Sequence, residues 1–159
     1  MLSTYSLVFV LFVALVIVDG QTFSNCGGAS DQIKLKSLAI SPYPIKVPGP
    51  ATFTLDVDVS ENIVNPLQTK YDLVATALGF PVKIKCENCV GSCTYDDWCK
   101  ACPTCPCPVN AGNQKMVIAM NFTSSIPIGS KATVKAQIDF LSATGQTGCV
   151  LMPKIEVRK

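Results

Sequence analysis

Nine cysteines are the residues of this chain whose type and spacing could do chemistry. Most of them fall in one segment, at Cys86, Cys89, Cys93, Cys99, Cys102, Cys105 and Cys107. Two C-x-x-C steps in this segment could hold zinc, because two thiolates at that spacing supply half of a tetrahedral site. The chain has no histidine, however, and an exported chain forms disulfides from such cysteines. We therefore expect a disulfide cluster, and no metal, with at least one cysteine left over because nine is odd.

The first residues indicate export. An apolar run, Leu7–Val18, is shorter than the ~20 residues that a membrane helix needs, but it suits a signal peptide. Val18 and Gly20 give the small residues that precede a cleavage site. We expect a signal peptide over residues 1–20, one domain over residues 21–159, and a secreted or lysosomal product. A membrane anchor is the alternative.

Catalytic chemistry has little support. Without histidine there is no Ser-His-Asp or Cys-His relay. Asp56 and Asp58 share a strand face and could form a glycosidase carboxylate pair, but a solvated face explains them better. Asp96 and Asp97 fit capping roles in a loop. We expect no enzyme and no cofactor. With Asp19 removed in the signal peptide, 13 basic minus 10 acidic residues give the mature chain a charge of +3, which is too low and too scattered for a nucleic-acid-binding protein.

Period-2 alternation of apolar and polar residues predicts half-buried antiparallel strands. The clear strands lie within residues 52–59, 71–77, 116–122 and 132–140, and weaker ones within 33–40, 82–85 and 149–157. Lys36-Ser37 and Pro153 suggest bulges. The fold class is all-β, an antiparallel sandwich or barrel stapled by disulfides.

The apolar strand faces can be read as a packed core or as the walls of a ligand cavity. Small residues at Ala75, Ala77, Ala132 and Ala136, and adaptable ones at Met116 and Met120, favour a cavity. Asn121-Phe122-Thr123 is an N-glycosylation sequon, with Asn121 on the outward face. Cys26 and Cys149 stand alone near the ends of the mature chain; pairing them would stabilise the fold by about 4–5 kcal/mol.

Six ordered blocks resemble the ganglioside activator proteins, which belong to the ML lipid-recognition superfamily. The blocks are Ser37–Gly49, Asn65–Leu67, Val82–Cys86, Gly91–Tyr95, Cys105–Pro108 and Gly148–Cys149. The resemblance implies a β-cup, a sandwich-like fold with a lipid cavity between its sheets. It also implies extraction of a glycosphingolipid from a membrane and its presentation to a soluble hexosaminidase.

The resemblance further implies the disulfides Cys26–Cys149, Cys86–Cys93, Cys99–Cys107 and Cys102–Cys105. Cys89 has no counterpart and is the expected unpaired cysteine, although it could compete for Cys102. The chain departs from the family in the exposed loops. Pro81 stands where a tryptophan is expected, Ile128 lies near another such position, and the loop between Cys99 and Cys105 is shortened. These departures affect docking to a hydrolase more than lipid binding.

We expect the lipid ligand to contact apolar side chains on the strand faces and at the rim of the cavity. These are Phe53, Leu55, Val57, Phe80, Val82, Ile84, Met116, Ile118, Met120, Phe122, Ile126, Ile128, Val134, Ile138 and Phe140. Among them Phe80, Ile126 and Ile128 are expected to contact the bilayer transiently, although burial in turns is the alternative. Two further readings stay open: a sterol or other lipid carrier of the same superfamily, and a secreted structural or defence module with a solid core.

Overall fold

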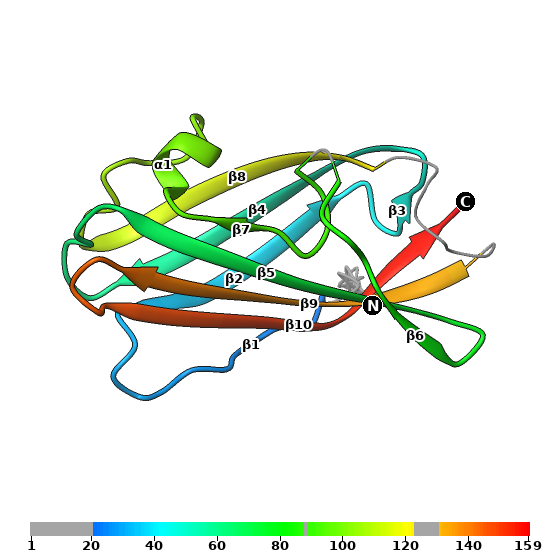
Figure 1. Ribbon diagram of the computed structural model, residues 1–159, viewed down its shortest axis with the longest axis horizontal. Helices are drawn as coiled ribbons and strands as arrows, with labels where there is room; N and C mark the ends of the chain where they lie inside the picture. Colours follow the sequence, from blue (N-terminus) through cyan, green and yellow to red (C-terminus); the bar gives the residue numbers. More distant parts are fainter. Residues whose placement is uncertain (1–20, 88, 123–130) are drawn as a thin grey trace, which may run out of the picture.

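The computed structural model describes residues 21–87, 89–122 and 131–159, in which strands predominate (Figure 1). The expected signal peptide and the positions of Ile126 and Ile128 lie outside these residues. The strands are β1 (Ser24–Asn25), β2 (Ile33–Ser41), β3 (Ile45–Lys46), β4 (Gly49–Val59), β5 (Leu67–Ala77), β6 (Phe80–Lys83), β7 (Thr94–Tyr95), β8 (Gly112–Phe122), β9 (Lys131–Ser142) and β10 (Thr147–Arg158). One short helix, α1, spans Trp98–Ala101. No helix in the described segments is long and apolar enough to cross a membrane.

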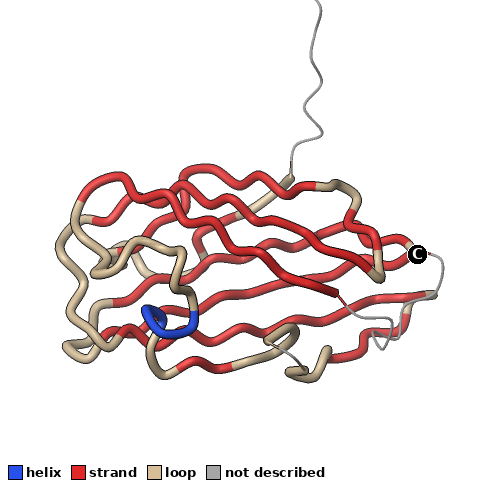
Figure 2. Tube along the Cα trace, turned by 90° about the horizontal axis from the view of Figure 1, so that it is seen from above, coloured by secondary structure: helices blue, strands red, loops and turns tan. Residues whose placement is uncertain are grey.

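The strands form one curled sheet in the order β6-β5-β9-β10-β2-β4-β8. Between β10 and β2 the pairing is parallel and has a single register pair, Gly148↔Ile33. This narrow junction separates a first layer (β6, β5, β9, β10) from a second layer (β2, β4, β8). A Cβ on Gly148 would come within 2.8 Å of both the Cβ and the carbonyl oxygen of Ile33, so the junction requires glycine. Both layers run along the long axis of the molecule (Figure 2).

The long strands form where alternation predicted them. In β9, inward residues from Ala132 to Phe140 are buried and alternate with more exposed polar ones. The register shifts between Leu35 and Ser37 in β2, and between Met152 and Ile155 in β10, where the sequence suggested bulges. The expected all-β fold is confirmed. The short elements β1, β3, β7 and α1 were not predicted, because two to four residues carry no periodic signal.

Loops at one end of the molecule are tied together by hydrogen bonds. We call this the loop end; it comprises residues 60–66, 108–111 and 143–146. Ile63 N donates to Val109 O (2.8 Å), and Ala111 N donates to the Asn62 side chain (2.8 Å). Gln146 accepts from Val64 N (2.8 Å) and donates to Asn62 O (2.9 Å). Three segments far apart in sequence are therefore held as one unit.

The opposite end is built differently. We call it the hairpin end; it comprises the β5–β6 turn at Leu78–Gly79, the start of β9 at Lys131, the end of β10 at Arg158, and β3. Figure 1 shows these parts gathered at the right of the molecule. Leu78 is 95% exposed and Phe80 is 74% exposed. This end therefore presents apolar side chains to its surroundings.

Candidate functional site: an apolar cavity between the layers

A cavity lies between the two layers, in the part of the molecule toward the hairpin end. Its volume is about 40 Å³, counted as the space open to the centre of a water molecule. The lining comes from both layers and from β3: Ile45, Phe53, Leu55, Tyr71, Leu73, Ile84, Ile118, Met120, Phe122, Val134, Ala136, Ile138, Met152, Ile155 and Val157. This wall is apolar apart from one phenol.

The phenol belongs to Tyr71, which is 5% exposed. Burial, and to a lesser degree the neighbouring Tyr95, raises the pKa of Tyr71 well above its usual range. The two rings meet edge to face, with their centroids 5.8 Å apart. Among the described residues no charged group lines the cavity, and a neutral phenol is a poor acid or base. What the lining offers a ligand is apolar contact.

Eight of the expected lipid-contact residues line this cavity: Phe53, Leu55, Ile84, Ile118, Met120, Phe122, Val134 and Ile138. Val57, Met116 and Phe140 are buried in the core without lining it. Phe80 and Val82 lie on β6, outside the cavity, and are exposed. The structure thus brings the central part of the expected set together and leaves Phe80 and Val82 at the surface.

Seven lining residues were not among the lipid contacts expected from the sequence: Ile45, Tyr71, Leu73, Ala136, Met152, Ile155 and Val157. Tyr71 and Leu73 lie on a recognised alternating run, so their periodicity could have included them. Ala136 was noted only for its small side chain. Ile45 lies in a proline-rich stretch without alternation, and Ile155 follows the bulge at Pro153, so no sequence pattern indicated them.

The cavity is small for a lipid tail. One water molecule needs roughly 10–15 Å³ by this measure, so the space would hold roughly three waters. An acyl chain therefore requires the walls to move apart. The side chains of Ile118 and Met120 are only partly buried on β8, which is the last strand of its layer. The β8 side of the cavity is consequently its least enclosed wall.

A second hollow of about 190 Å³ lies beside the cavity, between β8 and the cysteine-rich segment. It shares Tyr71, Ile118 and Met120 with the cavity wall, and α1 and Cys89 border it. Trp98, the single tryptophan of the chain, lines it and is 2% exposed. Its indole N–H has no hydrogen-bonding partner among the described residues. The hollow thus lies along the seam between β8 and β5.

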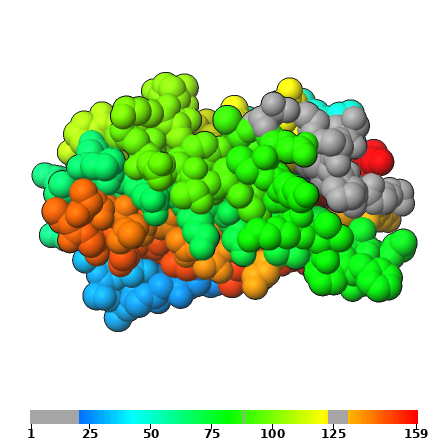
Figure 3. Space-filling view, viewed as in Figure 1, coloured from blue at the N-terminus to red at the C-terminus, as the bar shows by residue number. Residues whose placement is uncertain are grey.

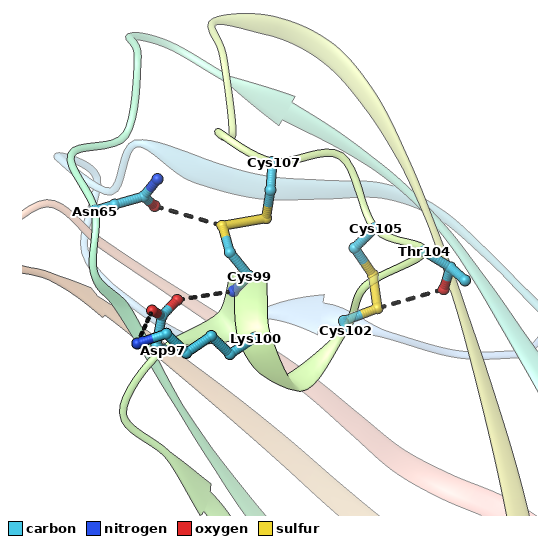
Figure 4. Close-up of a disulfide and its surroundings, with 8 residues drawn as sticks. All are labelled: Asn65, Asp97, Cys99, Lys100, Cys102, Thr104, Cys105 and Cys107. Carbon is cyan, nitrogen blue, oxygen red and sulfur yellow. Dashed lines mark hydrogen bonds and ion pairs between the residues drawn. A yellow bond between two sulfur atoms is a disulfide. The ribbon is translucent and has the colours of Figure 1, made fainter.

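Two disulfides, Cys99–Cys107 and Cys102–Cys105, anchor this segment around α1 (Figure 4). Asp97 caps α1 by accepting from Cys99 N (3.1 Å), as its position in the sequence suggested, and it pairs with Lys100 (3.2 Å). The helix is therefore fixed at both ends by covalent or charged contacts.

The other disulfides are Cys26–Cys149 and Cys86–Cys93, so all four join the pairs that the family resemblance implied. Cys89 is free and exposed. Its carbonyl accepts a hydrogen bond from the Tyr95 hydroxyl (3.1 Å), and burial together with Cys89 raises the pKa of Tyr95 to about 12. The eight paired cysteines have no free thiolate to offer a metal, and the described residues contain no cluster of metal-ligating side chains.

The turn of the β5–β6 hairpin projects from the molecule, and Figure 3 shows this part of the chain protruding at the lower right. Leu78 has φ 52°, in the left-handed region that side chains with a Cβ rarely adopt. Phe80 pairs with Ala77 across the hairpin. Leu78 and Phe80 together form what we call the apolar tip.

The remaining candidate residues lie apart from the cavity. The Asp56 carboxylate accepts a hydrogen bond from the Ser37 hydroxyl (2.5 Å) on the outer face, and Asp58 is exposed beside it. This is a solvated strand face, and it has no access to the cavity. Asn121 is exposed near the end of β8, while Thr123 of its sequon lies outside the described residues.

The match to a family of known proteins agrees with this architecture. The family model of the ML domain matches residues 20–153, which is most of the chain. The chain belongs to the ML domain family, and the resemblance found in the sequence is confirmed.

Two curated relatives of this chain are both ganglioside GM2 activators. The ganglioside GM2 activator of Mus musculus is 30% identical over 124 residues, covering 67% of this chain and 64% of that protein. The ganglioside GM2 activator of Macaca fascicularis is 33% identical over 78 residues, covering 49% of this chain and 41% of that protein. In both cases the match spans less than two thirds of the relative's own length.

A solved structure supports the fold. The crystal structure of a Niemann-Pick type C2 protein from the Japanese carpenter ant superposes with a TM-score of 0.54. The match covers 86% of this chain and 98% of that chain, at 15% sequence identity. At this identity the likeness concerns the fold alone.

Proposed function

We propose that this protein binds a lipid, holding its apolar tail between the two layers, and has no catalytic residues of its own. The observation that carries the proposal is the cavity wall, to which both layers contribute and in which the described part of the chain places no charged side chain. The two ganglioside activators matched by the sequence support the same class of ligand. A tail held in this way gains about 0.8 kcal/mol for each buried CH₂ group.

Entry of the tail requires the walls to separate. In the described sheet, β8 is hydrogen-bonded to β4 but not to β5 across the seam. An outward movement of β8 with its layer would widen the cavity without breaking a hydrogen-bonded ladder. Ile118 and Met120 face both the cavity and the seam hollow, so they are the side chains that this movement displaces first.

We also propose that the protein contacts a membrane when it extracts its lipid. Extraction of a lipid requires contact with a bilayer, and the apolar tip of Leu78 and Phe80 can enter its interface. Phe80→Asp should slow extraction of lipid from vesicles while leaving thermal stability nearly unchanged.

We further propose a secreted or lysosomal location, glycosylation at Asn121, and presentation of a glycosphingolipid to a soluble glycosidase. Assay of a hexosaminidase on ganglioside, with and without this protein, tests the last step.

The test of lipid binding uses the secreted protein purified from eukaryotic cells. Organic extraction followed by mass spectrometry should identify co-purifying lipid, and competition between acyl-chain and sterol probes should favour the acyl chain. Ala136→Leu, which fills the cavity, should weaken binding of an acyl-chain probe at least tenfold. Ala39→Leu adds the same atoms at an exposed position of β2, away from the cavity and the seam hollow, and should have no effect. If no lipid co-purifies, and the cavity-filling variant and its control are both folded and bind the probe equally, the lipid-binding proposal is wrong. The protein would then be a disulfide-stabilised structural module.

A further inference from the structure

The seam hollow continues the cavity toward the cysteine-rich segment. The two spaces share Tyr71, Ile118 and Met120 as common walls. The hollow, at about 190 Å³, is larger than the cavity by the same measure. A lipid whose tail enters between the layers therefore has room for its other end in the hollow.

The walls of the hollow are uncharged. Among the residues that the structure describes, no Asp, Glu, Lys or Arg borders it. A charged group that leaves water without an opposite charge beside it costs far more free energy than a neutral polar group does. The part of a ligand that leaves water in the hollow is therefore uncharged.

The indole N–H of Trp98 is a hydrogen-bond donor in need of an acceptor. Trp98 borders the hollow, is 2% exposed, and packs edge to face against Phe140 with ring centroids 6.4 Å apart. Thr69, which pairs with Phe140 across the sheet, is fully buried as well. Neither the Trp98 N–H nor the Thr69 hydroxyl has a hydrogen-bonding partner in the described part of the chain. Since buried donors and acceptors normally have partners, unused hydrogen-bonding capacity is concentrated around Phe140, next to the hollow.

The hollow also offers acceptors. The Tyr95 hydroxyl donates to the carbonyl of Cys89 (3.1 Å), and the Thr104 hydroxyl donates to the carbonyl of Val117 (3.4 Å). Each hydroxyl oxygen keeps lone pairs with which it can accept a further hydrogen bond. A ligand hydroxyl or secondary amide, which both donates and accepts, matches this combination of one unused donor with two acceptors.

We propose that the seam hollow holds the polar end of the bound lipid, and that this end carries an uncharged hydroxyl or amide group hydrogen-bonded to Trp98 Nε1. The inference rests on the proposed function and names the class of lipid that the protein selects. The Trp98 N–H is closed off from solvent. The outward movement of β8 that admits a tail also widens the hollow, because Ile118 and Met120 border both spaces. This movement brings the ligand oxygen to the N–H.

The orientation of the ligand can be tested on the wild-type mature protein, because Trp98 is the single tryptophan of the chain. Bromine quenches tryptophan fluorescence only on close approach. Hexadecanol with bromine on the carbon next to the hydroxyl should abolish most of the Trp98 emission. Hexadecanol with bromine at the far end of the chain should bind equally well and abolish little of it. Equal quenching by the two, or the reverse order, would overturn the proposal.

The class of the polar group is tested by competition against a fluorescent acyl-chain probe. Hexadecanol should bind roughly tenfold more tightly than either hexadecyl sulfate or hexadecyltrimethylammonium, because the hollow provides no opposite charge for them. All three competitors carry the same tail, so the comparison isolates the polar end. A charged competitor that binds as tightly as hexadecanol would contradict the assignment of an uncharged group.

The role of the indole N–H is tested with Trp98→Phe, which keeps an aromatic ring and removes the donor. Its affinity for hexadecanol should fall about fivefold, the usual net value of a neutral hydrogen bond. Its affinity for hexadecyl chloride, which has the same chain but a poor acceptor, should be unchanged. Equal losses for the two ligands would show that Trp98 contributes packing alone. The bromine experiment uses the wild type and therefore decides the orientation even if this variant does not fold.

A matched pair of tyrosine variants tests the acceptors. Tyr95→Phe removes a hydroxyl that borders the hollow, and it should weaken hexadecanol binding without weakening hexadecyl chloride binding. Tyr43→Phe removes a hydroxyl that lies outside the hollow, where it accepts from Glu156 N (3.3 Å), and it should affect neither ligand. Equal effects of the two substitutions on hexadecanol would be evidence against a hydrogen bond in the hollow.

Failure of this inference differs from failure of the proposed function. If all hexadecyl ligands bind with equal affinity and no preferred orientation, the protein carries lipid but does not select its polar end. If none of them binds and no lipid co-purifies, the proposed function is wrong and this inference fails with it. Ala136→Leu separates the two sites, because filling the cavity should weaken hexadecanol and hexadecyl chloride alike.

Discussion

The two ends of this molecule are built on opposite principles. At the loop end Ile63, Leu67 and Val109 are at most 4% exposed, and hydrogen bonds join the loops above them. Toward the hairpin end the layers enclose a cavity, and Leu78 and Phe80 project into solvent. The loop end holds the layers together, which allows the hairpin end to be hollow and exposed. Stability and ligand binding should therefore respond to mutations at different ends.

The largest effect expected on stability comes from Cys26–Cys149, near the loop end, which spans a sequence separation of 123 residues. Replacing both cysteines by serine should lower the free energy of unfolding by about 5 kcal/mol, because a very long loop is opened in the unfolded chain. The same change at Cys102 and Cys105, separated by 3 residues, should cost about 2 kcal/mol. Urea denaturation measures both, and equal losses would contradict the loop-entropy explanation.

A pair of leucines compares the two ends directly. Leu67→Ala should lower the free energy of unfolding by about 3 kcal/mol, because its fully buried side chain leaves a cavity at the loop end. Leu78→Ala should change it by less than about 0.5 kcal/mol, because that side chain is exposed. Vesicle flotation should show the reverse order, with loss for the Leu78 variant. A large destabilisation by Leu78→Ala would show that the tip is part of the core.

The smallest effect concerns Tyr71, which lines the cavity. Above about pH 10 tyrosine ionises in the unfolded chain, whereas the raised pKa of Tyr71 keeps it protonated in the folded state. The folded state then binds more protons, so the free energy of unfolding falls as pH rises. Tyr71→Phe should make this alkaline decline shallower in urea titrations between pH 8 and 11. Cys89→Ser serves as background, since a free cysteine exchanges with disulfides; an unchanged slope would contradict the assignment.

Much of the fold could be predicted, because a long strand with one solvent-exposed face shows an alternation of apolar and polar residues in its sequence. The alternation in β4, β8 and β9 was sufficient, and the bulges were indicated by a change of phase near Ser37 and by the proline at position 153. The cavity was predicted less well. Ile45 and Val157 meet there because the sheet curls and β3 joins β10, which is a property of the whole sheet. Whether an inward-facing valine packs in the core or lines the cavity depends on that curvature. Val57 is buried in the core, whereas Val134 lines the cavity.

The backbone of Leu78 has one more consequence. A left-handed conformation costs a residue with a Cβ roughly 1–2 kcal/mol, and the neighbouring Gly79 (φ 85°) bears no such penalty. In water, asparagine or glycine would suit position 78 better than leucine. Transfer of a leucine side chain into hydrocarbon returns about 1.5–3 kcal/mol, more than the strain. Leucine at position 78 is thus unfavourable in a protein that is always surrounded by water, and favourable in a protein whose turn is transferred at times into hydrocarbon.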